Sequence, residues 1–159
     1  MIPKEIIIHH SASSRDNTSL ADINAWHKAR WSNFCSSLGY YVGYHYVITA
    51  DGQVTHTRKN SELGAHCPPN EGRIGICLTG NFDLEMPLPC QLNTLQSVLE
   101  ELKGNYQLTD NNIFGHYQKG ITACPGKALI DWLNKYRQVS FLRKQIEAIK
   151  RLIENLLRK

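Results

Sequence analysis

The sequence of 159 residues predicts one α/β domain, with a central β-sheet flanked by helices, followed by a C-terminal amphipathic helix. Short apolar runs, such as 4–10 and 73–80, alternate with longer segments in which apolar residues recur at helical spacing. Hydrophobic residues make up 42% of the chain and charged residues 20%, which is typical of a globular protein rather than a disordered one. No apolar run approaches the roughly 18 residues of a transmembrane helix.

The first two elements are a buried strand and a capped helix. The run KEIIIHH (4–10) is apolar and β-branched, which is typical of a strand. Ser19, followed three residues later by Asp22, resembles a capping box and predicts that a helix begins there and covers 19–30. We expect Trp26 of this helix to lie in the core.

A hairpin is predicted over 43–59, where two alternating runs surround Asp51-Gly52. Strand alternation would place Tyr44 and Tyr46 on one face of the sheet. The remaining predicted elements are a central strand (73–80), a helix (89–106), a short strand (111–116) and a closing helix (126–137).

The C-terminal segment (137–159) is predicted to be separate from the domain (1–136). Its apolar residues are spaced 3, 4, 3, 4, 3, a heptad pattern: Val139, Leu142, Ile146, Ile149, Ile153 and Leu156. Three interpretations are open: self-association through 139–157, binding of this basic amphipathic helix to an anionic envelope surface, or packing on its own domain.

The net charge of +4 belongs to this C-terminal segment. Residues 137–159 carry seven Lys/Arg and two Glu, whereas the rest of the chain carries eleven Lys/Arg and twelve Asp/Glu. This distribution argues against a nucleic-acid-binding surface on the domain.

The five cysteines show no CxxC spacing and their number is odd, so we expect free thiols rather than a disulfide framework. The first four are expected to be mostly buried, with Cys77 in the core. The N-terminus lacks the long apolar run and the cleavage site of a signal peptide, so we expect synthesis in the cytoplasm.

Two stretches carry residue types that bind zinc. The loop FGHYQKGITACPG holds His116 and Cys124, and the strand end IIIHHS holds His9 and His10, whose side chains point to opposite faces. A catalytic zinc site typically uses three protein ligands and a water molecule, which one of the two adjacent histidines and the loop pair could supply. A cysteine nucleophile with a histidine base, or residues without function, fit the same pattern.

Six motifs occur in the order seen in one known family: IHHSAS, AWHKARW, GYHYVITADGQV, GAHC, RIGICLTGNFD and GHYQKGITACPG. With these motifs, 4–136 resembles the zinc-dependent N-acetylmuramoyl-L-alanine amidases of type 2. That family includes phage lysozymes of the amidase type and animal peptidoglycan recognition proteins. The resemblance implies a mixed β-sheet flanked by helices, with Zn²⁺ at one end of a groove.

The resemblance also implies roles for six residues. His9, His116 and Cys124 match the zinc ligands, whereas we expect His10 to pack or to support the site. Tyr44 matches the catalytic tyrosine, which would orient or help to deprotonate the zinc-bound water. Thr122 would donate to the oxyanion, with a purely loop-capping role as the alternative. His66 matches a position that lines the substrate groove.

The implied activity is hydrolysis of the amide bond between N-acetylmuramic acid and L-alanine of the peptidoglycan stem peptide. The alternatives are a peptidoglycan-binding module without catalysis and a cysteine hydrolase that uses Cys124 and His116. Cys124 favours the amidase, because non-catalytic recognition proteins of the family typically lack this ligand. We expect a phage or prophage endolysin that reaches the cell wall after holin-type release, with a wall-recycling enzyme as the alternative.

Overall fold

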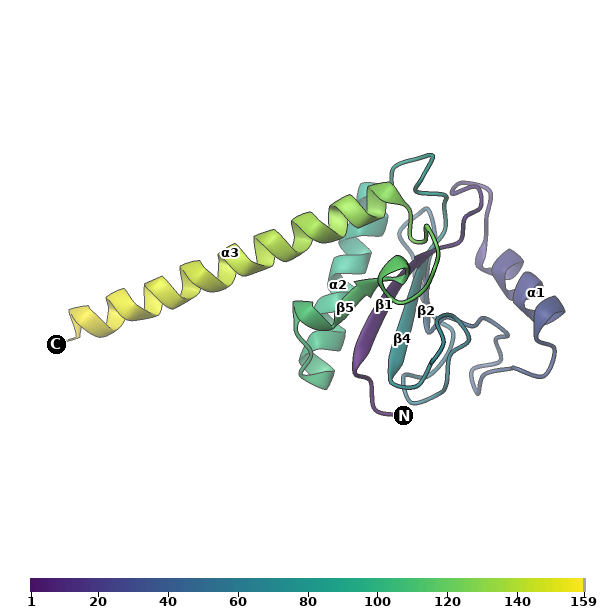
Figure 1. The fold of residues 1–159 in the computed structure, drawn as a ribbon, viewed down its shortest axis with the longest axis horizontal. Helices are drawn as coiled ribbons and strands as arrows, with labels where there is room; N and C mark the ends of the chain where they lie inside the picture. Colours follow the sequence, from purple (N-terminus) through teal and green to yellow (C-terminus); the bar gives the residue numbers. More distant parts are fainter. Residues whose placement is uncertain (159) are drawn as a thin grey trace.

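The computed structural model describes residues 1–158 and contains a five-stranded mixed sheet of order β3-β2-β4-β1-β5 (Figure 1). The strands are β1 (Glu5–His10), β2 (Tyr46–Ile48), β3 (Val54–His56), β4 (Arg73–Leu78) and β5 (Ile113–Gly115). All neighbours pair in parallel except β2 and β3, which form the predicted hairpin. The helices of the described residues are α1 (Leu20–Arg30), α2 (Pro89–Tyr106) and α3 (Lys127–Leu157), with 3₁₀ turns η1 (Asp110–Asn112) and η2 (His116–Gln118). The predicted α/β fold with a mixed sheet is confirmed.

The two faces of the sheet differ in chemistry. Ile6 and Ile8 of β1 point into the main core, where they pack with residues of α2 and α3 such as Leu95 and Leu129. His9 lies on the opposite face, because side chains alternate along a strand. Figure 1 shows α2 and the first turns of α3 on one side of the sheet and α1 on the other.

Helix α1 begins as predicted, because the Ser19 hydroxyl accepts from the Asp22 N–H and the Asp22 carboxylate accepts from the Ser19 N–H. Ile23 is buried on the sheet, and Nδ1 of His27 accepts from the Gly43 N–H at 2.9 Å. The expectation that Trp26 is a core residue is wrong: it is 50% exposed, because α1 packs on the sheet mainly through Ile23.

The expectation that Tyr44 and Tyr46 share a face is also wrong. Strand β2 begins only at Tyr46, so alternation does not extend back to Tyr44. Tyr46 lies in the main core, whereas Tyr44 packs beside Val47 and Ile23 on the opposite face, which is the face of His9. This reversal brings the phenol to the site described below.

Helix α3 runs without interruption through residues 136 and 137, so the proposed boundary between the domain and the C-terminal segment lies within one helix. The boundary therefore remains a prediction. Trp132 packs against the main core, whereas every residue from 141 to 158 is exposed. Among residues 1–158, no helix has the length and apolar character needed to cross a membrane.

All five cysteines are free, as predicted. Cys67 and Cys77 are buried, and Cys77 belongs to the core of the central strand β4. The expectation of burial is wrong for Cys35 and Cys90, which are exposed in a loop and in the first turn of α2 respectively.

Candidate metal centre

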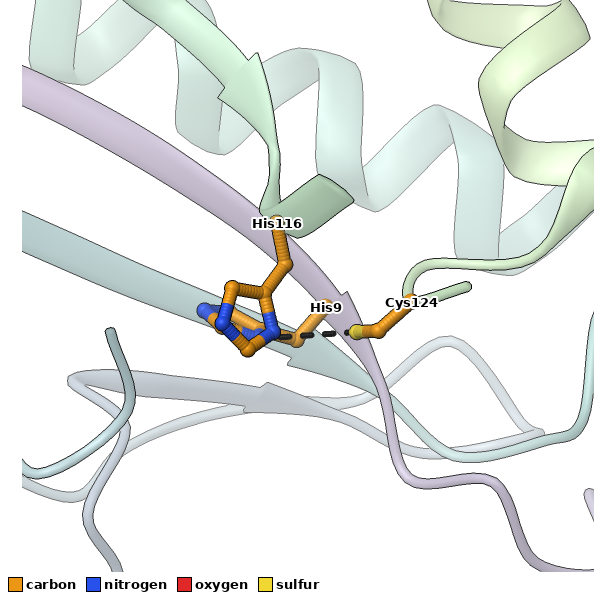
Figure 2. A group of neighbouring side chains, drawn as sticks. All are labelled: His9, His116 and Cys124. Carbon is orange, nitrogen blue, oxygen red and sulfur yellow. Dashed lines mark hydrogen bonds between the residues drawn. The ribbon is translucent and has the colours of Figure 1, made fainter. Parts of the chain in front are cut away.

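Three potential metal ligands converge at one edge of the sheet (Figure 2). His9 lies near the end of β1, and His116 follows directly after the neighbouring parallel strand β5. The loop after η2 then brings Cys124 back to β1, where the His10 N–H donates to its Sγ at 3.4 Å. Ligand atoms of the three side chains lie within 4.8 Å of one another, and Sγ of Cys124 is 3.6 Å from Nδ1 of His9. The residues predicted as metal ligands are therefore placed together.

The charge state of the three groups suits a cation. Burial, with the nearby imidazoles of His66 and His116, holds the pKa of His9 well below its usual value, so the ring is neutral. Burial also lowers the pKa of His116 and raises the pKa of the Cys124 thiol to about 12. A thiolate at this position therefore requires a positive charge beside it. Two neutral imidazoles and a thiolate form a donor set that fits Zn²⁺.

The same surroundings disfavour Cys124 as an unaided nucleophile. A thiol with a pKa of about 12 contains almost no thiolate at neutral pH. The thiol also has no protonated histidine beside it, because burial keeps both His9 and His116 neutral. The burial of the thiol, together with its position beside His9 and His116, thus favours a ligand role for this cysteine over a cysteine-hydrolase role.

The second ring nitrogen of His9 is held by His66. Nε2 of His9 lies 3.0 Å from Nδ1 of His66, and Nε2 of His66 lies 3.4 Å from the Arg73 carbonyl oxygen. A carbonyl can only accept, so His66 donates to Arg73 from Nε2 and accepts from His9 through Nδ1. Nδ1 of His9 then carries the lone pair that points toward Cys124. A metal-binding histidine is typically fixed by such a partner on its other nitrogen.

Two glycines make room for the ring of His66. A Cβ atom on Gly64 or on Gly75 would lie 2.6 Å from Cδ2 of His66. His45, which is fully buried, accepts from the Gly75 N–H at 3.1 Å through Nδ1 and holds this part of β4 in place. The contact between His66 and His9 was not predicted from the sequence. Its only local signal is Gly75, because a glycine inside a strand often marks a place where another group approaches the backbone closely.

Tyr44 and Thr122 lie close to the ligands but differ in exposure. The ring centroids of Tyr44 and His9 are 5.0 Å apart, and burial raises the pKa of Tyr44 well above its usual value, so that the phenol is neutral. Thr122 is exposed, and its Oγ1 accepts from the Cys124 N–H at 3.1 Å. Because a hydroxyl both accepts and donates, this loop contact leaves the Thr122 O–H proton available.

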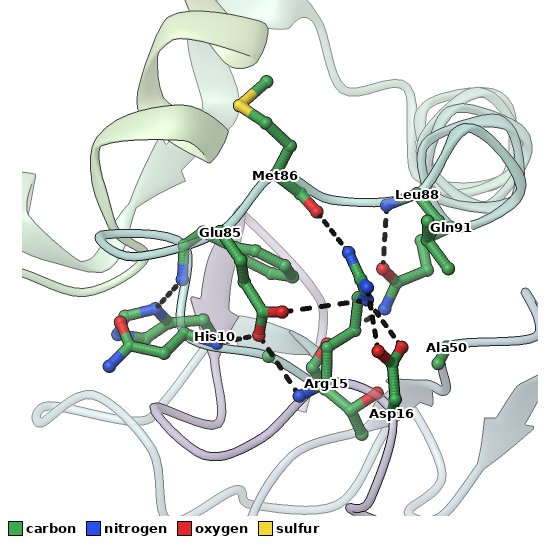
Figure 3. A network of polar contacts seen from close by, with 12 residues as sticks. His10, Arg15, Asp16, Ala50, Glu85, Met86, Leu88 and Gln91 are labelled. Carbon is green, nitrogen blue, oxygen red and sulfur yellow. Dashed lines mark hydrogen bonds and ion pairs between the residues drawn. The ribbon is translucent and has the colours of Figure 1, made fainter.

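His10 supports the loops beside the site, as expected for a residue on the opposite face from His9. Its Nδ1 accepts from the Phe82 N–H at 3.2 Å (Figure 3). In the same region the Glu85 carboxylate accepts from the Arg15 N–H at 3.1 Å, and the Arg15 guanidinium donates to the Met86 carbonyl and to Asp16. These contacts fasten the loop after β1 to the loop after β4.

Comparison with known proteins identifies the family. The family model described as N-acetylmuramoyl-L-alanine amidase matches residues 1–127. An endolysin of Klebsiella phage KP32 is 31% identical over 144 residues, which cover 86% of this chain and 89% of the endolysin. Peptidoglycan-recognition protein SD of Drosophila simulans is 31% identical over 133 residues, or 80% of this chain and 69% of that protein.

A solved structure gives the same result. N-acetylmuramoyl-L-alanine amidase LysC from Clostridium intestinale superposes with a TM-score of 0.72 at 27% identity, over 84% of both chains. The family match ends at residue 127, where α3 begins. The chain therefore belongs to the N-acetylmuramoyl-L-alanine amidase family.

Proposed function

We propose that this amidase holds Zn²⁺ with His9, His116 and Cys124 and hydrolyses the bond between N-acetylmuramic acid and L-alanine of peptidoglycan. The observation that carries the proposal is the convergence of the three ligand atoms within 4.8 Å, two of them from neutral imidazoles. A zinc ion in such a site lowers the pKa of a bound water molecule toward about 7 and polarises the scissile carbonyl.

Tyr44 and Thr122 are proposed to act on the reacting atoms. A neutral phenol beside His9 can hydrogen-bond the attacking water and keep one of its lone pairs directed at the carbonyl carbon. The Thr122 hydroxyl, which accepts from the Cys124 N–H, can donate its own proton to the oxyanion of the tetrahedral intermediate. Both residues lie within the part of the chain that the family model matches.

His66 is proposed to contact the substrate and to position His9. His66 is only partly buried as a residue and lies beside His9, which supports a place for it next to the bound stem peptide. The 3.0 Å contact between its Nδ1 and Nε2 of His9 supports the positioning role, because this contact selects the tautomer of His9 that can bind a metal.

A peptidoglycan-binding module without catalysis is the second candidate function, because relatives of this chain include a peptidoglycan-recognition protein. The buried thiol of Cys124 favours the enzyme, since binding alone needs no cysteine ligand. Metal analysis of the purified chain, combined with mass spectrometry of digested peptidoglycan, separates the two functions. We expect about one zinc per chain and free stem peptides. Bound zinc with intact muropeptides would show that the chain only binds.

The endolysin relatives support one cellular context for this chain. We propose that the chain acts on the bacterial cell wall after holin-type release, as a phage lysin rather than a wall-recycling enzyme. Expression in the cytoplasm of a susceptible bacterium should leave cells intact until a holin is co-expressed. Equal lysis with and without the holin would contradict this route.

A further inference from the structure

The part of α3 beyond the family match carries an apolar stripe that the domain does not cover. Its six residues are 47% to 63% exposed: Val139, Leu142, Ile146, Ile149, Ile153 and Leu156. In heptad notation Val139, Ile146 and Ile153 take position a, and Leu142, Ile149 and Leu156 take position d. Figure 1 shows this part of α3 extending away from the sheet. Exposed a and d positions over nearly three heptads are the surface of a coiled-coil strand.

The opposite side of α3 is fastened to the domain. The Asp110 carboxylate accepts from the Ser140 hydroxyl at 2.6 Å and from Nζ of Lys144 at 3.0 Å. Ser140 occupies position b and Lys144 position f, which lie on the other side of a helix from positions a and d. The domain therefore holds α3 with the apolar stripe turned outward, which excludes packing of the stripe on its own domain.

We propose that this stripe binds a second copy of the chain, with the two α3 helices parallel in a coiled coil. The residue types at the core positions support two strands. All three a residues are β-branched, and two of the three d residues are leucine, the combination that favours parallel dimers. No polar residue interrupts the stripe.

The flanking charges select the parallel direction. In a parallel pair, each g residue faces an e residue five positions later in the other copy. Gln145 then faces Lys150, and Leu152 faces Leu157, so no like charges meet. In an antiparallel pair, e residues face each other, and Lys150 of one copy would meet Lys150 or Arg143 of the other. Leu152 and Leu157, which are exposed in one copy, extend the apolar contact only in the parallel pair.

A parallel pair would place two amidase domains at the same end of the coiled coil. This consequence rests on the proposed function: two catalytic sites held together can bind two stem peptides of one wall polymer, which raises the apparent affinity without a new contact. The association itself requires neither zinc nor peptidoglycan. Measuring it in the absence of both separates failure of this proposal from failure of the proposed function.

The test compares two matched double variants of the full chain by sedimentation velocity over a range of concentrations. Ile146→Asp with Ile153→Asp adds two carboxylates at position a, and should convert a dimer to a monomer. Ala148→Asp with Asn155→Asp adds the same two charges with the same spacing at position c, and should leave the dimer intact. Unchanged helix content by circular dichroism and an unchanged urea-unfolding midpoint at low protein concentration would show that each variant is folded.

A third variant tests the direction of the helices. Gln145→Glu would face Lys150 of the other copy in the parallel pair, and we expect the dimer dissociation constant to fall roughly threefold or more, with the effect lost at high salt. In an antiparallel pair residue 145 faces Leu152, so an unchanged constant would overturn the parallel arrangement. A monomeric wild-type chain at every concentration would overturn the proposal, whether or not the chain binds vesicles of anionic phospholipid.

Discussion

At the scale of single residues, the site depends on how tightly His66 is enclosed. The ring contacts Nε2 of His9 on one side and lies against the backbones of Gly64 and Gly75 on the other. Protein interiors accommodate even one added methyl group poorly. The orientation of His9 is therefore sensitive to changes on a strand that contributes no ligand.

Gly75→Ala should disturb the site through His66. The added Cβ would lie 2.6 Å from the ring, so we expect a loss of about 1–3 kcal/mol in the free energy of unfolding and weaker zinc binding. Gly104→Ala is the control, because Gly104 is exposed on α2 with no neighbour within 4 Å, and should stabilise the fold by about 0.5–1 kcal/mol. Urea unfolding and a competitive zinc chelator measure the two effects. Equal behaviour of both variants would contradict the role of His66.

Tyr44→Phe tests the proposed action of the phenol on water. The aromatic packing beside His9 is kept and only the hydroxyl is lost, so zinc content and stability should change little. We expect turnover of muropeptides to fall at least about 100-fold, the usual contribution of a group that acts on a proton in the transition state. Activity within a few-fold of the wild type would assign Tyr44 to packing alone.

The three candidate ligands, His9, His116 and Cys124, were predictable from sequence because their spacing and order resemble those of a family, and the structure places them together. The prediction that Tyr44 and Tyr46 share a face was wrong, because it extended strand alternation to residues that precede β2. The contact between His9 and His66 joins residues 57 positions apart, and nothing local in the sequence encodes such a contact. The prediction that Trp26 is buried was wrong, because helical spacing alone does not show how much of the surface of α1 the sheet covers.

At the scale of elements, the sequence of α3 contains no signal that would end the helix between the domain and the C-terminal segment. No glycine or proline occurs between residues 127 and 159, so nothing ends the helix where the composition changes. The helix of 31 residues therefore belongs to the domain at one end and projects at the other. Beyond the residues that pack in the core, α3 is attached through Asp110, which accepts from Ser140 and Lys144 and also from Lys103 at 2.8 Å.

Asp110→Asn should loosen this attachment in a pH-dependent way. Burial alone would raise the pKa of Asp110, but the hydrogen bonds from Lys103, Ser140 and Lys144 outweigh it and hold the pKa at about 2. The depressed pKa means that the ionised carboxylate stabilises the folded state above about pH 4, and that this contribution is lost as the pH falls toward 2. We expect the variant to lose about 1–2 kcal/mol at pH 7 and almost nothing near pH 2. Chemical denaturation at both pH values tests this difference, and a constant difference would contradict it.

At the scale of the whole molecule, stability and chemistry lie on opposite faces of one sheet. The main core with Ile6 and Ile8 holds the fold together, whereas His9 and Tyr44 on the other face form the site. The overall architecture was predictable from sequence because the strands and helices carry clear periodicity. The outward position of the apolar stripe was not predictable, since it follows from contacts to Asp110 made across the fold.

Deletion of residues 139–159 should separate the stability of the fold and the chemistry of the site from binding to the cell wall. The metal ligands and Tyr44 are retained, so we expect zinc content and cleavage of dispersed muropeptides to be unchanged. Lysis of whole cells should decrease, because the truncated protein is a monomer with one catalytic site, whereas the proposed dimer of the full chain carries two. A truncation after Lys144 keeps the two partners of Asp110 on α3, Ser140 and Lys144, and controls for lost stability. Equal mass and equal lysis for the full and truncated chains would contradict a role for the tail.

The wide separation of the ligands along the chain has a consequence during synthesis. His9 is among the first residues to leave the ribosome, whereas Cys124, 115 positions later, is among the last before α3. A nascent chain that has not yet reached this cysteine offers only part of the donor set. The proposed zinc site can therefore be completed only when translation of the domain is nearly finished.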